Sequence, residues 1–366
     1  MSQVQSEPNS SNKPALLGLG FAELAERLAP LDIPSYRVRQ IGTWLHQKGA
    51  TTFGEMSDLP AALRLKLNGG YSIDPLLVAK HLKSTDTVQK LLLHNGDQQV
   101  FECVLLPYRS RVSCCLSSQV GCPMACTFCA TGLGGFDRNL TQQEITSQLL
   151  MLQRLSEKRI SHLVMMGMGE PLLNWQNVRG ALEFFSTDLD MSYRRMTIST
   201  VGIVPGIREV TEWGKPVHLA LSLHSPFDEV RSQLMPVNAK WPVAEAIQAM
   251  KDHAASTHRK ITIEYLLIAG INDQPETARE IARLLGKTPH VINVIPFNWV
   301  ATQEGFKRPT REGVRQFLSA LEREGLNATE RTERGHDIAA ACGQLAGAHT
   351  GKFGGRSQKS ALPVLS

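Results

Sequence analysis

Three cysteines occupy eight residues of the chain in the spacing C-x3-C-x2-C. Cys122, Cys126 and Cys129 lie in the run GCPMACTFC, which begins at Gly121. Thiolates are the usual protein ligands of iron–sulfur clusters, and a 4Fe-4S cluster normally takes four of them. Three thiolates leave one iron free to bind a small molecule, whereas a structural zinc site requires four protein ligands. Because no second C-x2-C pair exists, the pattern favours an open catalytic cluster over a zinc site.

The composition is typical of a globular protein in a reducing compartment. The 366 residues suffice for one large α/β domain and a small one, and the contents of 42% hydrophobic and 20% charged residues are ordinary. Seven mostly clustered cysteines do not form a secreted disulfide framework. No signal peptide is recognisable, and no apolar run reaches the ~20 residues of a membrane span. We expect a cytoplasmic protein without a membrane partner, whose net charge of +5 is compatible with a polyanion.

The N-terminal part is predicted to be a small helical domain over residues 15–80, preceded by a disordered segment over residues 1–14. Apolar residues recur at helical spacing from Phe21 onward. A third helix is expected to be capped at Ser57-Asp58, to have Pro60 in its first turn and to run through Leu67, before the run Asn68-Gly69-Gly70. The polar side of the second helix carries basic residues that face either solvent or RNA, namely Arg37, Arg39 and Lys48.

Residues 81–108 are predicted to be a β-rich linker. The β-rich runs 99–106 and 112–118 flank a turn. If Tyr108 and Arg109 form a two-residue turn, Glu102 lies directly opposite Cys115, with Cβ atoms ~5 Å apart. A slip of one residue in the turn would break this pair.

Two further cysteines are predicted to be buried small apolar residues. Successive strand residues face opposite sides, so Cys114 and Cys115 cannot both face one pocket. Cys103 likewise faces away from its neighbour Glu102. We therefore expect Cys103 and Cys114 to pack in the core.

Short apolar strands alternate with helices over residues 109–347, which predicts a parallel α/β sheet. The expected strands are 112–118, 162–166, 196–199, 217–223, 261–268 and 291–296. The expected helices include 141–157, 174–187, 242–255, 276–285 and 310–324. Six strand–helix units are too few for an eight-fold barrel, and they fit an open, TIM-like partial (β/α)6 barrel. Residues 348–366 are expected to be a flexible tail.

Small polar residues follow several of these strands, at the edge where ligands bind in parallel α/β folds. Gly169 and Glu170 come directly after the second strand, where a glycine permits close backbone approach and a carboxylate can accept from an ammonium group. Further polar residues follow later strands and predict a ligand rim: Ser199, Ser222 with Leu223 and His224, and Asn298.

Over residues 15–347 the chain resembles the RlmN family of radical S-adenosylmethionine (SAM) enzymes. The resemblance is carried by the strings SSQVGC from Ser117, VMMGMGEPLLN from Val164 and GHDIAAACGQL from Gly335. It implies methylation of carbon 2 of adenine in 23S ribosomal RNA (rRNA) and probably in transfer RNA (tRNA). It also implies a partial (β/α)6 barrel, a 4Fe-4S cluster on the three cysteines, and SAM bound at the strand-end residues.

The resemblance also implies a two-cysteine mechanism. Cys342 takes a methyl group from one SAM, and a second SAM is cleaved to a radical that removes hydrogen from the S-methyl group. The resulting carbon radical adds to the adenine. Release of the product then uses Glu102 as proton acceptor and Cys115 as the thiol that forms a disulfide with Cys342. This mechanism requires the segment 335–341 to be a mobile loop. We also expect a ferredoxin or flavodoxin to supply electrons, and we expect the enzyme to be a monomer.

Three alternatives remain open at this point. The related enzyme Cfr methylates carbon 8 of the same adenine, and motifs do not separate the two activities. A radical SAM enzyme with another substrate would not need Cys342. A non-catalytic iron–sulfur module that binds RNA would leave Glu102, Cys115 and Cys342 without roles.

Overall fold

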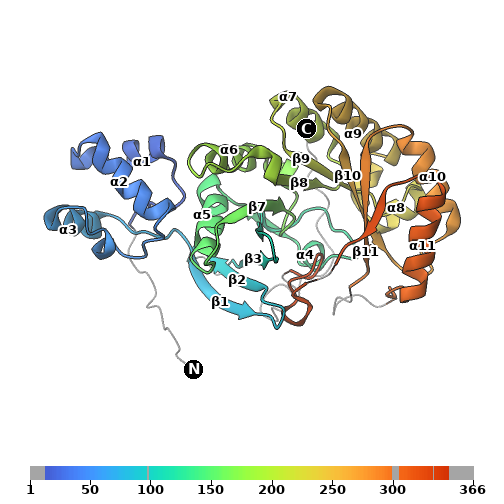
Figure 1. Cartoon of the computed structure of the whole chain (residues 1–366), viewed down its shortest axis with the longest axis horizontal. Helices are drawn as coiled ribbons and strands as arrows, with labels where there is room; N and C mark the ends of the chain where they lie inside the picture. Colours follow the sequence, from blue (N-terminus) through green and yellow to red (C-terminus); the bar gives the residue numbers. More distant parts are fainter. Residues whose placement is uncertain (1–12, 97–98, 299–304, 333, 346–366) are drawn as a thin grey trace.

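The N-terminal residues form the expected helical unit. The computed structural model describes residues 13–96, 99–298, 305–332 and 334–345. Three helices make up the unit (Figure 1): α1 (Phe21–Leu28), α2 (Ser35–His46) and α3 (Ala61–Gly70). Helix α3 continues beyond Leu67, because the amide of Tyr71 still donates to the Leu67 carbonyl. The predicted disordered start, except for residues 13–14, and the predicted tail lie outside the described residues.

The helical unit is fastened to the rest of the molecule by specific contacts. The Phe21 amide donates to Asp188 over 2.7 Å, and Thr146 donates to the Gly18 carbonyl over 2.7 Å. The ring of His46 on α2 stands edge-on to Phe184, with 5.2 Å between ring centroids. Contacts of this kind hold the unit against α5 (Gln142–Gln153) and α6 (Trp175–Thr187).

A continuous ten-stranded sheet forms the core. Its strand order is β1-β2-β3-β4-β7-β8-β9-β10-β11-β12. Neighbouring strands are antiparallel from β1 to β4 and parallel from β4 to β12. The strands are β1 (Leu77–Lys83), β2 (Gln89–His94), β3 (Phe101–Pro107), β4 (Val112–Cys115), β7 (Ile160–Met165), β8 (Met196–Thr200), β9 (His218–Ser222), β10 (Ile261–Leu267), β11 (His290–Pro296) and β12 (Ala328–Glu330). The six predicted parallel strands and the open barrel are confirmed, and β12 adds a seventh parallel strand.

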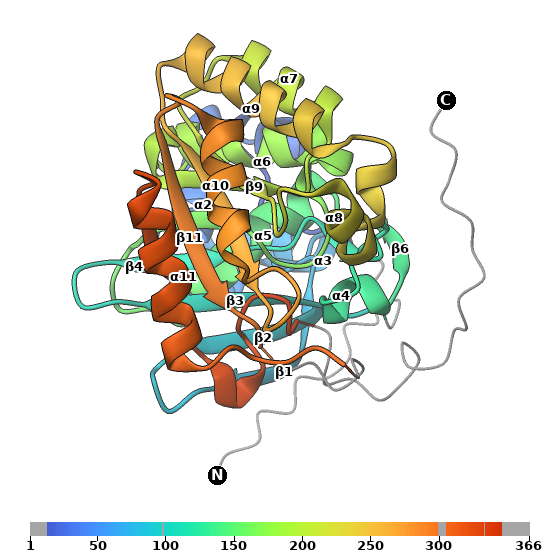
Figure 2. The ribbon, with the colours of Figure 1, turned by 90° about the vertical axis from the view of Figure 1, so that its right-hand side faces the viewer.

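Helices cover the outer side of the curved sheet (Figures 1 and 2). They are α5 (Gln142–Gln153), α6 (Trp175–Thr187), α7 (Val204–Trp213), α8 (Asp228–Leu234), α9 (Val243–Thr257), α10 (Pro275–Leu285) and α11 (Arg311–Arg323). The expected helices did not include α7, which has Pro205 and Gly206 in its first turn, or α8. Within the described residues, no helix has both the length and the apolarity that crossing a membrane requires.

The residues predicted as a linker are part of the sheet. Strand β1 begins at Leu77, inside the range expected to be helical, and β3 pairs with β4 of the parallel core. Three antiparallel strands therefore extend one edge of the barrel. They provide the surface on which the chain's last described segment lies.

The predicted pairing of Glu102 with Cys115 is wrong. Cys115 lies opposite Val104, because the turn closes on Arg109 and Ser110 with Tyr108 donating to the Arg111 carbonyl over 2.8 Å. The register moves by two residues along one strand, an even number, so the alternation of faces is unchanged. Glu102 still lies on the same face of the sheet as Cys115, two residues further along β3.

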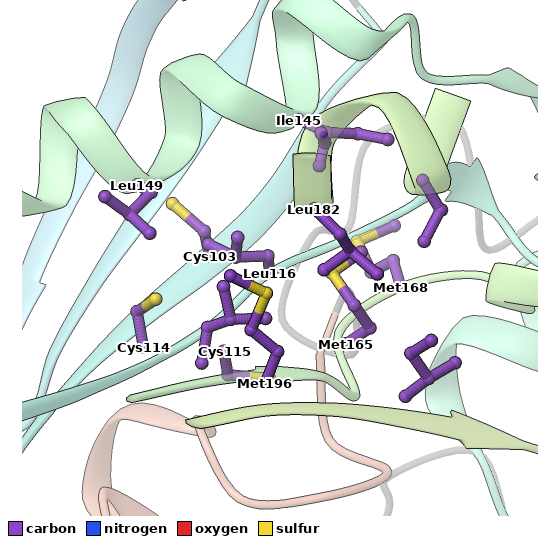
Figure 3. Packing of buried hydrophobic residues seen from close by; sticks show 14 of the residues in the cluster. Cys103, Cys114, Cys115, Leu116, Ile145, Leu149, Met165, Met168, Leu182 and Met196 are labelled. Carbon is purple, nitrogen blue, oxygen red and sulfur yellow. The ribbon is translucent and has the colours of Figure 1, made fainter. Parts of the chain in front are cut away.

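The two remaining cysteines pack in the core as predicted. Cys103 and Cys114 are fully buried. Figure 3 shows both side chains beside Leu149 of α5, on the helix-covered side of the sheet. The strand-face argument that separated Cys114 from Cys115 is confirmed.

The predicted strand 112–118 is shorter than expected, because β4 ends at Cys115. After β4 the chain leaves the main sheet, and β5 (Gln119–Gly121) pairs with β6 (Phe136–Asn139). Gly121 has a φ of +74°, and a Cβ there would lie 2.1 Å from the Gly135 carbonyl oxygen. Only glycine allows this crossing, which closes the base of the loop that carries the three clustered cysteines.

Candidate functional site

The three clustered cysteines line one cavity. Cys122, Cys126 and Cys129 lie between β5 and the short helix α4 (Ala130–Leu133), at the carboxyl ends of the parallel strands. We call this space the cysteine-loop cavity. Cys126 is buried, the other two are half-buried, and all three are free thiols.

The surroundings of these thiols favour soft metal ligation. Burial raises the pKa of all three, while the amides of Met124 and Gly169 near Cys122 act in the opposite direction. A bound metal would supply the positive charge that the thiolates lack. Among the described residues, no three ligand side chains converge closely enough for a single metal ion. Three thiols that line one cavity are the kind of ligand that an iron–sulfur cluster takes.

Gly169 and Glu170 form a narrow polar wall of the same cavity. Gly169 has a φ of +98°, and a Cβ there would lie 2.5 Å from the Cβ of Gln119. The Glu170 carboxylate is buried and accepts from the amides of Leu172 at 3.1 Å and Val201 at 2.8 Å. Burial nevertheless raises the pKa of Glu170 to about 7. A cationic ligand group would therefore be bound strongly, because it stabilises the charged carboxylate.

Four other predicted rim residues line this cavity, namely Ser199, Ser222, His224 and Asn298. The Nδ1 atom of His224 accepts from the Leu266 amide over 3.0 Å, which leaves the proton of the neutral ring on Nε2. Burial lowers the pKa of His224 to about 3, so the ring stays neutral. The Oδ1 atom of Asn298 accepts from Arg308, whereas its buried Nδ2 has no partner among the described residues. That amide group is a donor available to a ligand.

Leu223 does not line the cavity. Its side chain is fully buried in the core, while Ser222 and His224 on either side of it line the cavity wall. The Leu223 carbonyl accepts from Nε of Arg231 over 3.1 Å. The structure therefore gives Leu223 a packing position and no side-chain contact with a ligand in the cavity.

Cys342 connects two cavities. It lines the cysteine-loop cavity, and it also lines a second space together with Cys115, which we call the thiol cavity. The segment around Cys342 is fixed to the cysteine loop, because the Ala130 amide donates to the Gly343 carbonyl over 2.8 Å and Thr131 donates to the Leu345 carbonyl. The fold thus brings Cys115 and Cys342, which are far apart in sequence, to one place.

Arg331 lies between these thiols and a carboxylate. Its guanidinium is 3.5 Å from Oε2 of Glu264, and it lines both cavities. The charge of Cys342 is the main cause that raises the pKa of Arg331, and Glu264 and Cys115 add to it. Burial and then Cys342 raise the pKa of Cys115 to about 12, while Arg331 acts in the opposite direction. Arg331 is the cation that can stabilise either thiolate.

Glu102 shares a face of the sheet with Cys115, and it does not line the thiol cavity. Its Oε2 is 3.2 Å from Nζ of Lys90, and each side chain is 1% exposed. Apart from this ion pair, neither carboxylate oxygen has a hydrogen-bond partner among the described residues. Lys90 also donates to the Ala339 carbonyl over 2.9 Å, on the segment that leads to Cys342.

The segment 335–341 lies against the turn between β1 and β2 (Figure 1). Asp337 accepts from Ser84 and from the Thr85 amide, and the Gly335 amide donates to Asp86 over 3.1 Å. Ala339 has a φ of +49°, a strained value for a residue with a side chain. The structure shows the segment held in one position, and the predicted mobility stays a prediction.

Sequence reasoning missed Lys90 and Arg331. Lys90 stands in the run QKLLLH, where a single lysine in an apolar strand could have been noticed as a buried charge. Arg331 follows β12, a strand of three residues that gives no periodic signal. Lys90 contacts the Ala339 carbonyl from 249 residues away, and Arg331 contacts Glu264 from 67 residues away.

Comparison with known proteins gives matches along most of the chain. Residues 15–73 match the family model of the ribosomal RNA large subunit methyltransferase N-terminal domain, and residues 116–285 match that of the radical SAM superfamily. The first of these covers the helical unit, and the second covers the cysteine loop and most of the parallel strands.

Several curated relatives are similar over nearly their whole length. A probable dual-specificity RNA methyltransferase RlmN of Heliobacterium modesticaldum is 42% identical over 362 residues, 96% of this chain and 94% of the relative. One of Symbiobacterium thermophilum is 45% identical over 337 residues, 90% of each chain. The dual-specificity RNA methyltransferase RlmN of Marinobacter nauticus is 41% identical over 351 residues, 92% of this chain and 94% of the relative.

A solved structure has the same architecture. The crystal structure of a radical SAM methyltransferase from Sphaerobacter thermophilus superposes with a TM-score of 0.86 at 39% sequence identity. The match covers 91% of this chain and 99% of the other.

Proposed function

Since the chain belongs to the RlmN family of dual-specificity RNA methyltransferases in the radical SAM superfamily, we propose that it methylates carbon 2 of adenine in 23S rRNA and tRNA. The observation that carries this proposal is the position of Cys342, which lines both the cysteine-loop cavity and the thiol cavity. A residue that receives a carbon from a cofactor and passes it to a base must reach both.

The cofactors would occupy the cysteine-loop cavity. Membership of the superfamily implies SAM and an iron–sulfur cluster, and three thiols without a fourth ligand fit a 4Fe-4S cluster with one open iron. Glu170 and the backbone at Gly169 would hold the amino group of SAM. Ser199, Ser222, His224 and the free amide of Asn298 would bind its remaining polar groups. When bound, the cluster and SAM supply the methyl group, an electron and the radical that abstracts hydrogen.

Cys342 would act first as a nucleophile. Its thiolate takes the methyl group from SAM, with Arg331 close enough to stabilise the negative charge on sulfur. After a hydrogen atom is removed from the S-methyl group, its carbon bonds to the adenine. The RNA is then attached covalently to the protein through Cys342.

Cys115 and Glu102 would release the product. Glu102 accepts a proton from the adenine ring, and the Cys115 thiolate bonds to the sulfur of Cys342. The bond between that sulfur and the transferred carbon breaks, so a Cys115–Cys342 disulfide remains and the methylene carbon left on the base takes up a proton to become the methyl group. The unpaired electron of the adduct would return to the cluster when it is bound. Glu264 is another carboxylate beside the thiols, but its oxygens already accept from Asn293 and Arg331.

The remaining partners are part of the same proposal. A ferredoxin or flavodoxin would supply the electrons, and the enzyme would act as a monomer. The helical unit would contact RNA through basic residues on α2 and just after it, namely Arg37, Arg39 and Lys48.

Nucleoside mass spectrometry tests the proposal. RNA from cells with and without the protein would be digested and compared, and we expect 2-methyladenosine only where the protein is present. The reconstituted enzyme should lose product formation in Glu102→Gln and keep most of it in Glu264→Gln. Detection of 8-methyladenosine instead would assign the Cfr-type reaction. If neither methyladenosine were detected, the enzyme would act on another substrate.

A further inference from the structure

A third cavity, distinct from the cysteine-loop cavity and the thiol cavity, lies at the amino ends of the parallel strands, opposite the cysteine loop. Its wall includes residues at or near the start of four strands: Ser113 of β4, His162 of β7, Thr197 of β8 and His218 of β9. Arginines that precede these strands also line it, including Arg111 and the pair Arg194–Arg195. We call this space the basic cavity.

The positive charge of the basic cavity is not balanced. Within the described part of the chain, none of Arg111, Arg194, Arg195 or the neighbouring Arg259 forms an ion pair with a carboxylate. Glu264 is the one acidic side chain among the lining residues, and it is already paired with Arg331.

The two histidines of the cavity respond to this positive potential. Arg259 lies 3.1 Å from Nε2 of His218. Burial and then the charge of Arg259 lower the pKa of His218, and burial followed by Arg111 and Arg195 lowers that of His162. Because like charges so close together are unfavourable, the cluster should bind anions.

The basic cavity leads to the reactive thiols. It shares Leu106, Tyr108, Arg331 and Thr332 with the thiol cavity, which Cys115 and Cys342 line. Tyr108 is 39% exposed, and the guanidinium groups of Arg111 and Arg334 stand 5.0 and 5.1 Å from its ring centroid. An exposed aromatic ring between basic side chains is a suitable surface for a nucleobase beside its phosphates.

We propose that the target adenosine enters from the amino ends of the strands, and that Arg111, Arg194, Arg195 and Arg259 bind the RNA phosphates that flank it. An enzyme that acts on a base in RNA must take the nucleotide out of its stack and hold the backbone on either side. The carboxyl ends of the strands are occupied by the cysteine loop and the residues assigned to SAM. The opposite end is basic, open and continuous with the thiols. This inference rests on the proposed function and identifies where its RNA substrate is held.

Steady-state kinetics with an RNA hairpin test the proposal. The probe is a synthetic hairpin with one adenosine in its loop that the wild-type holoenzyme methylates. In Arg194→Gln/Arg195→Gln we expect the KM for this RNA to rise at least about tenfold at 150 mM salt, with kcat at saturation and RNA-independent SAM cleavage within twofold. The slope of log KM against log salt concentration should fall by about 0.7 for each phosphate that the variant no longer neutralises.

The control removes the same charge elsewhere. Arg315→Gln/Arg323→Gln changes two arginines of α11 outside the barrel, one of them 72% exposed, and should keep the wild-type KM. A KM within twofold of wild type for Arg194→Gln/Arg195→Gln, or an equal loss in the control, would overturn the proposal. Failure of the wild-type enzyme to methylate any RNA would instead refute the proposed function.

A second measurement does not depend on how the variants fold. The wild-type holoenzyme would be treated with phenylglyoxal, which modifies arginine, with and without the hairpin. We expect the RNA to protect the peptide that contains Arg194 and Arg195, and to leave Arg315 unprotected. Equal modification of Arg194 and Arg195 in both samples would contradict the proposed entry route.

Discussion

The ammonium group of Lys90 lies 3.2 Å from the carboxylate of Glu102, with both side chains 1% exposed. The same ammonium donates to the Ala339 carbonyl, three residues before Cys342. Lys90 therefore joins the proposed proton acceptor to the segment that carries the proposed nucleophile. A movement of that segment would remove one of the interactions that hold Lys90 beside Glu102.

Removal of Lys90 alone should destabilise the protein. In Lys90→Met the Glu102 carboxylate would remain buried without a counter-ion, so the free energy of unfolding should fall by about 3 to 5 kcal/mol. The double variant Lys90→Met/Glu102→Gln should recover most of this loss, because it leaves no buried charge. Urea titration of the purified proteins measures both values. A loss below about 1 kcal/mol in the single variant would show that the pair is not buried in solution.

Cluster binding and SAM cleavage should both be lost when any one of the three clustered cysteines is replaced. In Cys129→Ala two thiols remain, which cannot hold a 4Fe-4S cluster with one open iron. We expect both the iron content and the reductive cleavage of SAM to be lost, whereas Cys103→Ala, a core substitution, should keep both. Anaerobic iron analysis and detection of the cleaved nucleoside are the measurements. A full iron content and activity in Cys129→Ala would refute the radical SAM assignment for these residues.

Cys115 and its neighbour should behave differently. Because methylene transfer precedes disulfide formation, Cys115→Ala should accumulate RNA bound covalently to Cys342. Cys114→Ala should turn over nearly normally, because Cys114 faces the core. The adduct is a slow band on a denaturing gel that disappears after nuclease treatment. Such a band in Cys114→Ala and not in Cys115→Ala would reverse the roles given to the two residues.

Protonation of His46 should weaken the protein in mild acid. Burial lowers the pKa of His46 from 6.5 to about 4, so the folded protein binds fewer protons than the unfolded chain. Neutral His46 therefore gives its full contribution to the free energy of unfolding above pH 6.5. This contribution is lost as the pH falls towards 4, and the loss is about 2 kcal/mol at pH 5. His46→Phe should lose this part of the pH dependence of unfolding, while the exposed control His81→Phe should keep it. Equal pH dependence in all three proteins would contradict this role.

The sequence was sufficient for the parts of the fold that depend on local pattern. Local sequence pattern predicts the six apolar strands, because it depends on the spacing of apolar residues and on the turn residues that end each strand. It also predicts the strand-end residues Gly169, Glu170 and Asn298. The face on which Cys115 lies follows from the alternation of a strand. These features need no knowledge of distant segments.

Features that depend on distant segments were not predictable. The turn at Arg109 and Ser110 shifted the register and removed the direct pairing of Glu102 with Cys115, since the position of a two-residue turn does not follow from the alternation of the strands. Leu223 stands between two cavity-lining residues and points into the core, which a run of three residues does not reveal. Lys90 acquires Glu102 as its partner only when β2 pairs with β3, and Arg331 acquires Glu264 only when β12 joins the sheet that contains β10.

The central claim is that the transferred carbon passes through Cys342, and isotope labelling tests it most directly. Protein that carries a trideuterated methyl group on Cys342 would react for one turnover with unlabelled SAM and the RNA hairpin. We predict 2-methyladenosine that retains deuterium, because the S-methyl carbon itself becomes the product methyl group. Product without deuterium from fully labelled protein would contradict the account, since the methyl group would then have come from SAM without passing through Cys342.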